Sequence, residues 1–259
     1  MGDDIHTRLR EEQGPVDGLV DEAALERTPG AAEAAREAAG GTVPGAIAFF
    51  DLDGTLVAGN TQALLVRFLR SARIVSRRFV ASAALWYVRY KLGLVQVTEE
   101  ERARAASALA GLSTKEVDRV ISQFVDSQLM PRLHPGALAA LREHQAAGDR
   151  VVVLSAALEP VVRWLCKELE VADYFAARCE VAGGVYSGRL EGLTPHGERK
   201  AEMALDLMSR VGADPDECWA YADHDSDIAL LRSVGHPVAV HPRSGLAQAA
   251  QAAGWPILP

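Results

Sequence analysis

Short apolar runs alternate with longer segments of helical periodicity over most of the chain. Four runs have the length and composition of buried strands: 46–53 (AIAFFDLD), 149–156 (DRVVVLSA), 218–225 (CWAYADHD) and 236–242 (HPVAVHP). Amphipathic helical segments follow or precede them at 135–147, 159–169, 198–212 and 226–235. Strands that alternate with helices predict an α/β fold, here a Rossmann-like parallel sheet.

A long helical block interrupts this alternation directly after the first strand. Residues 60–94 contain no proline, and their apolar side chains recur at three- and four-residue spacing. Ser113 and Glu116 have the spacing of a capping box, which predicts a further helix through Met130, before Pro131. We therefore expect an inserted, all-helical cap module, of the kind that closes over a site.

A small β-hairpin is predicted near the middle of the chain. Residues 178–192 alternate in the manner of strands around Gly183 and Gly184. With the cap, this gives three expected regions: an acidic, disordered tail at 1–44, a Rossmann-like core at 45–59 and 131–259, and the helical cap at 60–130.

Composition is that of a soluble globular protein with a substantial core, since 49% of the 259 residues are hydrophobic. The longest apolar stretch without charge, 79–88, has about half of the ~20 residues that a bilayer-spanning helix needs. The first 44 residues contain no apolar leader segment, and three cysteines form neither an even disulfide set nor a CxxC pair. These features predict a cytoplasmic protein.

Charge is unevenly distributed along the chain. Residues 1–44 hold ten acidic and four basic side chains, whereas 60–98 hold seven basic and no acidic ones. The basic segment has three interpretations: a solvated helix face, an electrostatic funnel for anionic substrates, and weak contact with an anionic membrane surface. The net charge of −8 argues against a nucleic-acid partner. The oligomeric state is left open.

Two carboxylates follow the first predicted strand, at Asp51 and Asp53. Residues two apart in a strand point to one face, so both can reach the crevice outside the carboxyl end of a parallel sheet. Such a pair can hold Mg²⁺ while one carboxylate acts as nucleophile and the other as acid and base. The alternative is a turn in which aspartate caps the strand end.

Four more polar residues stand at the ends of predicted core strands or the starts of helices. Ser155 ends VVVLS before a helix, where its hydroxyl and the backbone N–H groups could bind an anion. Lys200 begins a later helix, and Asp223 and Asp227 follow the third strand. Each has a structural alternative as a cap or a solvated charge. Together they supply the parts of a phosphate site.

The motifs DLDGT at 51–55, Ser155, Lys200 and YADHDSD at 221–227 resemble the four motifs of the haloacid dehalogenase superfamily. More narrowly, the chain resembles the phosphoserine-phosphatase-like branch, in which a helical cap is inserted after the first motif. The resemblance extends over 46–258 and omits the acidic tail.

The resemblance implies a covalent mechanism. Asp51 is expected to attack phosphorus and form an aspartyl-phosphate, and Asp53 to protonate the leaving oxygen and then activate water. Covalent capture divides the slow hydrolysis of a phosphate monoester into two easier steps. The other expected site residues hold the Mg²⁺ cofactor or the phosphoryl group: the Asp53 carbonyl, Asp51 and Asp223 for the metal, Asp227 and Gly54 in support, and Thr55, Ser155 and Lys200 for phosphoryl oxygens.

These expectations define an Mg²⁺-dependent phosphomonoesterase for a small phosphorylated metabolite. Phosphoserine phosphatases carry glutamate nine residues after the nucleophile, where it helps to hold the substrate ammonium group; here the residue is Asn60. A neutral amide would bind an ammonium less strongly, so Asn60 argues for another substrate. The alternatives are phosphoserine phosphatase itself, a phosphatase of phospholipid or lysophospholipid head groups, and a non-catalytic regulator that binds a phosphorylated ligand.

Overall fold

The computed structural model describes residues 46–72 and 106–259 of the chain. The predicted tail at 1–44 lies outside the described residues, and so does 73–105. Predictions for the basic segment therefore fall largely outside them as well, because five of its seven basic residues belong to 73–105: Arg73, Arg77, Arg78, Arg89 and Lys91.

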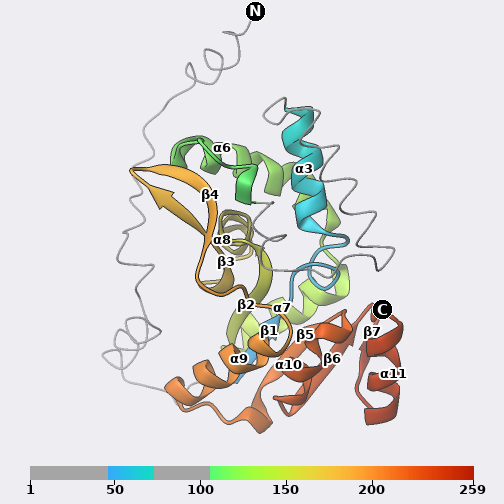
Figure 1. Ribbon diagram of the computed structural model, residues 1–259. Coiled ribbons are helices and arrows are strands. Elements are labelled where there is room, and N and C mark those ends of the chain that lie inside the picture. The colour runs from blue at the N-terminus through green and yellow to red at the C-terminus, as the bar shows by residue number, and fades with distance from the viewer. Residues whose placement is uncertain (1–45, 73–105) are drawn as a thin grey trace, which may run out of the picture. The chain divides into compact units, whose positions relative to one another are not determined.

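A seven-stranded sheet forms the centre of the described structure (Figure 1). Its strand order is β4-β3-β2-β1-β5-β6-β7, and every neighbouring pair is parallel except β3 and β4. The strands are β1 (Ile47–Phe50), β2 (Arg150–Leu158), β3 (Asp173–Ala182), β4 (Val185–Glu191), β5 (Trp219–Ala222), β6 (His236–Val240) and β7 (Ile257–Leu258). The expected Rossmann-like α/β fold is confirmed.

The central strand β1 is apolar at every position because both of its faces are buried. Ile47 and Phe49 pack in one hydrophobic cluster with α9, α10 and α11, whereas Ala48 and Phe50 pack in another with α7 and α8. Figure 1 draws α9 and α10 in front of the strands and α7 behind them. These helices are α7 (Pro135–Ala147), α8 (Glu159–Glu168), α9 (Glu198–Val211), α10 (Ile228–Arg232) and α11 (Ser244–Ala253), with single 3₁₀ turns at η4 (Pro215–Glu217) and η5 (Asp225–Asp227).

Two α-helices are described within the range predicted for the cap, α3 (Thr61–Ser71) and α6 (Thr114–Phe124). Apolar side chains of both belong to the same buried cluster as α7 and α8. The capping box that opens α6 is confirmed: the Ser113 hydroxyl accepts from the Glu116 N–H, and Glu116 accepts from the Ser113 N–H at 2.9 Å.

The prediction that this helix continues to Met130 is wrong, because α6 ends at Phe124. A wider π-helical turn, η2 (Val125–Leu129), and a 3₁₀ turn, η3 (Met130–Arg132), follow α6 instead. Pro131 explains the change, because it has no N–H for an α-helical hydrogen bond and its ring would collide with the carbonyl four residues earlier.

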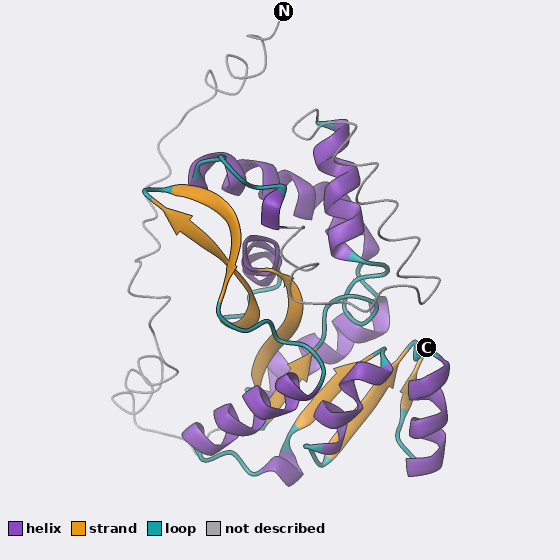
Figure 2. Cartoon of the chain, in the orientation of Figure 1, coloured by secondary structure: helices purple, strands orange, loops and turns teal. Residues whose placement is uncertain are grey.

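The predicted hairpin is formed by β3 and β4, which pair antiparallel across Gly183 and Gly184. Both glycines have positive φ, 58° and 77°, as this tight turn requires. The tip pairs with the segment before α6: the Gly184 carbonyl accepts from the Thr114 N–H at 3.0 Å, and Tyr186 N–H donates to the Leu112 carbonyl at 2.9 Å. Figure 2 shows the orange hairpin reaching this helix.

The strand boundaries differ from the sequence expectation at two places. β2 continues to Leu158, and its pairing with β3 becomes irregular between Leu154 and Leu158. The short strand β7, in the C-terminal segment GWPILP, was not expected, because two residues carry no periodicity. It pairs with β6 at Ala239 and Ile257 and extends the sheet by one edge strand.

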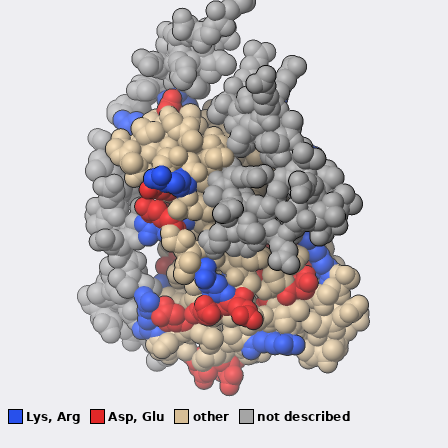
Figure 3. Space-filling view, viewed as in Figure 1, with Lys and Arg blue, Asp and Glu red and all other residues tan. Residues whose placement is uncertain are grey.

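Charged side chains of both signs lie next to one another on the face drawn in Figure 3. On the hairpin, for example, Arg189 pairs with Glu180 at 2.8 Å and Arg178 with Glu191 at 3.5 Å. Among the helices of 46–72 and 106–259, none is long and apolar enough to cross a membrane. All three cysteines are free, as expected.

Candidate active site

The candidate site lies where the strand order reverses direction. From β1 the chain builds β2, β3 and β4 on one side of the sheet, and later β5, β6 and β7 on the other. A crevice forms at such a point outside the carboxyl ends of the strands. Asp51 directly follows β1 and Asp223 directly follows β5, and the Asp51 N–H donates to the Tyr221 carbonyl at 3.0 Å.

Most of the buried polar side chains in the described structure are residues that the sequence singled out. Nine polar or charged residues are buried, and six of them were expected in the site. Burial of a charge is unfavourable unless it is paired, so such a concentration needs a cause beyond folding. The six are Asp51, Thr55, Ser155, Lys200, Asp223 and Asp227; the other three are Thr61, His144 and Thr194.

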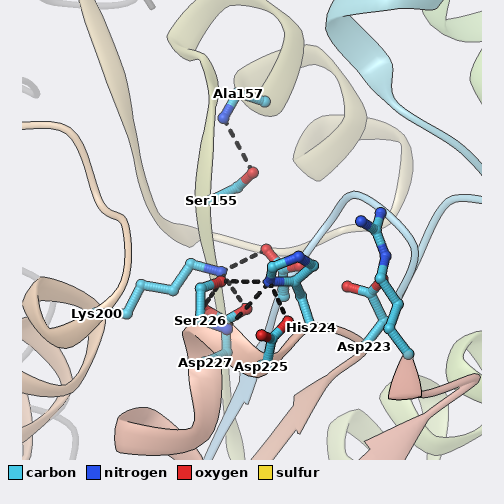
Figure 4. A network of polar contacts seen from close by, with 10 residues as sticks. Ser155, Ala157, Lys200, Asp223, His224, Asp225, Ser226 and Asp227 are labelled. Carbon is cyan, nitrogen blue, oxygen red and sulfur yellow. Dashed lines mark hydrogen bonds and ion pairs between the residues drawn. The ribbon is translucent and has the colours of Figure 1, made fainter. Parts of the chain in front are cut away.

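Lys200 joins two of the buried carboxylates in one ion-pair network. Its ammonium Nζ lies 2.6 Å from Asp51 Oδ1 and 2.9 Å from Asp227 Oδ2. Figure 4 shows Lys200 extending toward the segment that carries Asp227, with dashed lines between them. Burial alone would lower the pKa of Lys200, but the charges of Asp51 and Asp227 outweigh it and raise that pKa above its ordinary value. Lys200 therefore stays charged beside Asp51.

Gly54 allows the loop after β1 to approach Asp223 closely. Its φ of +88° favours glycine, and a Cβ built on Gly54 would lie 2.2 Å from Asp223 Oδ2. Any side chain at position 54 would therefore displace the carboxylate. This contact explains in physical terms why glycine follows the two aspartates of the loop.

Asp53 is bound to the start of α3. One carboxylate oxygen accepts from the Thr61 N–H at 2.8 Å, and the other lies 3.3 Å from Asn60 Nδ2. The Asn60 side chain also caps α3, since its Oδ1 accepts from the Ala63 N–H at 2.9 Å. Asn60 thus has a structural role that the sequence did not suggest, alongside the substrate role expected for it.

Ser155 does not lie at a helix N-terminus, contrary to the sequence expectation. It stays within β2, and α8 begins four residues later, at Glu159. The Ser155 hydroxyl accepts from the Ala157 N–H at 3.1 Å, inside the irregular end of the strand. Figure 4 shows this hydroxyl turned toward Ala157, above the charged cluster. Its predicted role as a phosphoryl ligand stays a prediction; the hydroxyl accepts from Ala157 and keeps its own hydrogen for donation to a phosphoryl oxygen.

Burial also raises the pKa values of three carboxyls. Desolvation dominates for Asp51, although Lys200 opposes it. Burial raises the pKa of Asp53 to about 7, and burial together with the Asp51 charge raises that of Asp223 to about 7. These carboxyls bind protons more tightly in the folded state than in the unfolded state, where their pKa is near 3.9. The metal-free protein therefore loses stability as pH rises from about 4 to about 7.

The donor set suits a magnesium ion. Four carboxylates, those of Asp51, Asp53, Asp223 and Asp227, are buried or partly buried, and the buried cation Lys200 contacts two of them, Asp51 and Asp227. No group of three His, Cys, Asp or Glu side chains poised to hold a metal occurs within 46–72 and 106–259. Mg²⁺ does not need one, since it typically takes one or two carboxylates and fills its other positions with water, substrate and carbonyl oxygens.

Arg243 is a site residue that the sequence reasoning missed. It follows β6, its N–H donates to the Asp223 carbonyl at 2.9 Å, and its Nε lies 3.5 Å from Asp223 Oδ2. The guanidinium lowers the pKa of Asp223 against the larger effect of burial. Asp51 and Asp223 are predicted because each is a polar residue at the end of a core strand. The same reasoning would have predicted Arg243, which follows the apolar run at 236–242.

The family is identified by a direct match. Residues 48–232 match the model of the haloacid dehalogenase-like hydrolases, a range that includes β2, β5, all of β1 except Ile47, and all of the expected catalytic carboxylates. The chain belongs to this family.

Three relatives within this range of similarity indicate the branch of the family that the chain resembles. The chain is 33% identical to the inhibition of morphological differentiation protein of Streptomyces azureus, over 84% of this chain and 79% of that protein. It is 26% identical to phosphoserine phosphatase SerB1 of Mycobacterium tuberculosis, over 82% and 70%. Identity is also 26% to a histidinol-phosphatase of Neisseria meningitidis, over 82% and 97%. The expected likeness to the phosphoserine-phosphatase-like branch is confirmed.

A solved structure shares the fold over most of this chain. A protein of unknown function from Bordetella pertussis superposes with a TM-score of 0.74 and 27% sequence identity, over 83% of this chain and 99% of that one. The fold is therefore shared with an experimentally determined structure.

Proposed function

We propose that the protein is a phosphatase that hydrolyses a small phosphorylated metabolite through an aspartyl-phosphate on Asp51, with Mg²⁺ as cofactor. The enzyme class, a hydrolase of phosphoric monoesters, follows from the family and from its phosphatase-named relatives. The observation that carries the mechanism is the buried pair of Asp51 and Lys200, 2.6 Å apart at the carboxyl end of the central strand.

The first chemical step is attack of the Asp51 carboxylate on phosphorus, while the bond from phosphorus to the ester oxygen breaks. Asp53 gives its proton to the departing oxygen, so the product leaves as a neutral alcohol. A carboxyl with a pKa of about 7 is partly protonated at neutral pH and can act as this acid. Lys200, charged and buried, stabilises the negative phosphoryl group as it transfers.

The second step returns the enzyme to its starting state. Asp53, now a carboxylate, takes a proton from water as the water oxygen attacks the phosphorus of phospho-Asp51. The bond from phosphorus to Asp51 then breaks, which releases inorganic phosphate. Asp51, Asp223 and the carbonyl of Asp53 would hold Mg²⁺, which when bound neutralises phosphoryl charge and reduces repulsion of the nucleophile.

A non-catalytic regulator that binds a phosphorylated ligand is the rival function. Such a protein has no need for the nucleophile, the acid and the lysine together, whereas here Asp51, Asp53 and Lys200 are all present. Turnover separates the two functions. Release of inorganic phosphate from an aryl phosphate, followed by a panel of phosphorylated metabolites including phosphoserine, tests the proposal and ranks its substrates. No turnover with Mg²⁺ on any member would contradict it.

Removal of the metal is expected to abolish turnover and to lower stability in a pH-dependent way. Mg²⁺ binds to ionised carboxylates. Above pH 7 the buried negative charges of Asp53 and Asp223 destabilise the metal-free fold, and the bound metal would compensate them. Mg²⁺ at about 100 times its dissociation constant should add about 2.7 kcal/mol. Thermal unfolding with Mg²⁺ and with EDTA, at pH 5.5 and pH 8, measures this effect. The Mg²⁺-induced shift should be larger at pH 8; an equal shift at both values would contradict the assigned ligands.

Asp53→Asn is expected to affect substrates according to their leaving groups. The variant has no proton to give, so hydrolysis of alkyl phosphates should fall by roughly 10²–10⁴-fold. Aryl phosphates with acidic leaving groups need less proton transfer and should lose less. Values of kcat/KM over a series of leaving groups report the first step alone, because the alcohol departs before water attacks, and they measure how strongly the loss depends on the leaving group. A uniform loss across the series would mean that Asp53 is not the acid.

The substrate is expected to differ from phosphoserine because Asn60 replaces the family's glutamate. Asn60→Glu should raise kcat/KM for esters with a neighbouring ammonium group relative to other esters. The same change removes the side-chain cap of α3, at a cost of about 1 kcal/mol. Asn60→Ala, which removes the cap without adding charge, is the matched control. Phosphoserine as the best substrate of the unmodified protein would contradict this prediction.

A further inference from the structure

Two buried hydroxyls have no hydrogen-bond partner within the described residues, those of Thr55 and Thr61. Thr61 is only 1% exposed. A buried polar atom left without a partner costs about 1–3 kcal/mol, and buried polar groups are normally paired. The motif already assigns Thr55 to the phosphoryl group. No role in the proposed mechanism accounts for Thr61.

The backbone of Thr61 limits where its hydroxyl can lie. The Thr61 N–H donates to Asp53 Oδ1 at 2.8 Å. In any threonine rotamer the hydroxyl oxygen lies within about 4 Å of the backbone nitrogen, so it lies within roughly 7 Å of the Asp53 carboxylate. Thr61 therefore places an unpaired hydroxyl near the carboxyl that is proposed to exchange a proton with the substrate.

Helix formation does not explain the hydroxyl. Thr61 is the first residue of α3, and the cap is supplied by the preceding Asn60 through Ala63. A threonine can also bond to a carbonyl in the preceding helical turn, but the first residue of a helix has no preceding turn. Valine, which has the same shape, would fill this site without leaving a polar atom unpaired.

On the basis of the proposed function, we propose that Thr61 is a further catalytic residue, whose hydroxyl donates a hydrogen bond to the oxygen opposite Asp51. In the first step this is the ester oxygen, on which negative charge develops as its bond to phosphorus breaks. The N-terminus of α3 favours negative charge at the same place. The substrates served are alkyl phosphates, whose alkoxide leaving groups need the most stabilisation.

Thr61→Val and Thr61→Ser test this assignment as a matched pair. Valine removes the hydroxyl and keeps both the β-branch and the N–H that binds Asp53, whereas serine keeps the hydroxyl. Loss of one such donor costs about 10²–10³-fold in kcat at other sites. Thr61→Val should lose activity on this scale with an alkyl phosphate and less with a nitrophenyl phosphate, and Thr61→Ser should stay within a few-fold of the parent.

Thermal unfolding provides the second readout. The melting temperature of Thr61→Val should equal or exceed that of the parent, because an unpaired buried hydroxyl has been removed. If the valine variant is as active as the parent on alkyl esters, the proposal is overturned. It is also overturned if the melting temperature falls and activity is lost equally on every ester. A parent protein without phosphatase activity would overturn the proposed function and this inference together, whereas an active parent with an unaffected valine variant would overturn this inference alone.

Discussion

Replacing Asp51 by asparagine is expected to reduce hydrolysis of every phosphate ester by at least roughly 10³-fold, while the protein remains folded. The amide has nearly the same volume as the carboxylate but is not a nucleophile, so no aspartyl-phosphate can form. The fold should persist because Lys200 keeps its second partner, Asp227, at 2.9 Å. Phosphate release measures the rate, and circular dichroism and thermal unfolding show whether the variant is folded.

Detection of the covalent intermediate is the direct control for this variant. Rapid acid quenching of the parent protein with substrate should yield a chain heavier by one phosphoryl group, and Asp51→Asn should yield none. A variant that retains more than a few per cent of the parent rate, or that still becomes phosphorylated, would show that the nucleophile is another residue.

Replacing Lys200 by methionine is expected to destabilise the protein by about 3–5 kcal/mol at pH 8 and to abolish turnover. Methionine has a similar length but no charge, so Asp51 and Asp227 would remain buried without their cation. Protonation of Asp51, whose pKa burial raises, relieves this repulsion. The loss should therefore be largest at high pH and should shrink as pH falls toward 5. Urea unfolding at pH 5 and pH 8 measures both values.

The double variant Lys200→Met with Asp227→Asn is the matched control for this effect. It removes one negative charge along with the positive one, so much of the lost stability at pH 8 should return while turnover stays absent. If the single variant is as stable as the parent at pH 8, the Lys200 network contributes nothing to folding, and the buried lysine would be retained for catalysis alone.

The sequence predicts well those parts of the fold that depend on patterns close together in the chain. The four predicted core strands are present, and α7 spans Pro135–Ala147 and ends at Gly148, which adopts the left-handed conformation expected of a helix C-terminus. β1 was recognisable because a strand buried on both faces is apolar throughout. Asp51 and Asp223 were found from strand ends alone, since parallel strands bring their carboxyl ends together.

Features that depend on contacts between distant segments were not predictable in this way. The partnership of Asn60 with Asp53, and the burial of Thr61, exist only once α3 is placed against the loop after β1. Ser155 was misplaced because the extra strand residues after it, up to Leu158, have the same apolar character as the first turn of a helix. β7 is too short to have a period of its own.

The contact between Gly54 and Asp223 has a consequence for how the protein can change over time. A library of all twenty amino acids at position 54 should retain glycine alone, because every other side chain begins with a Cβ that would occupy the place of Asp223 Oδ2. Arg243 contacts the same carboxylate, yet 55% of its side chain is exposed, so many replacements fit there. New substrate preferences should therefore arise at exposed positions such as Arg243, while Gly54 stays constant.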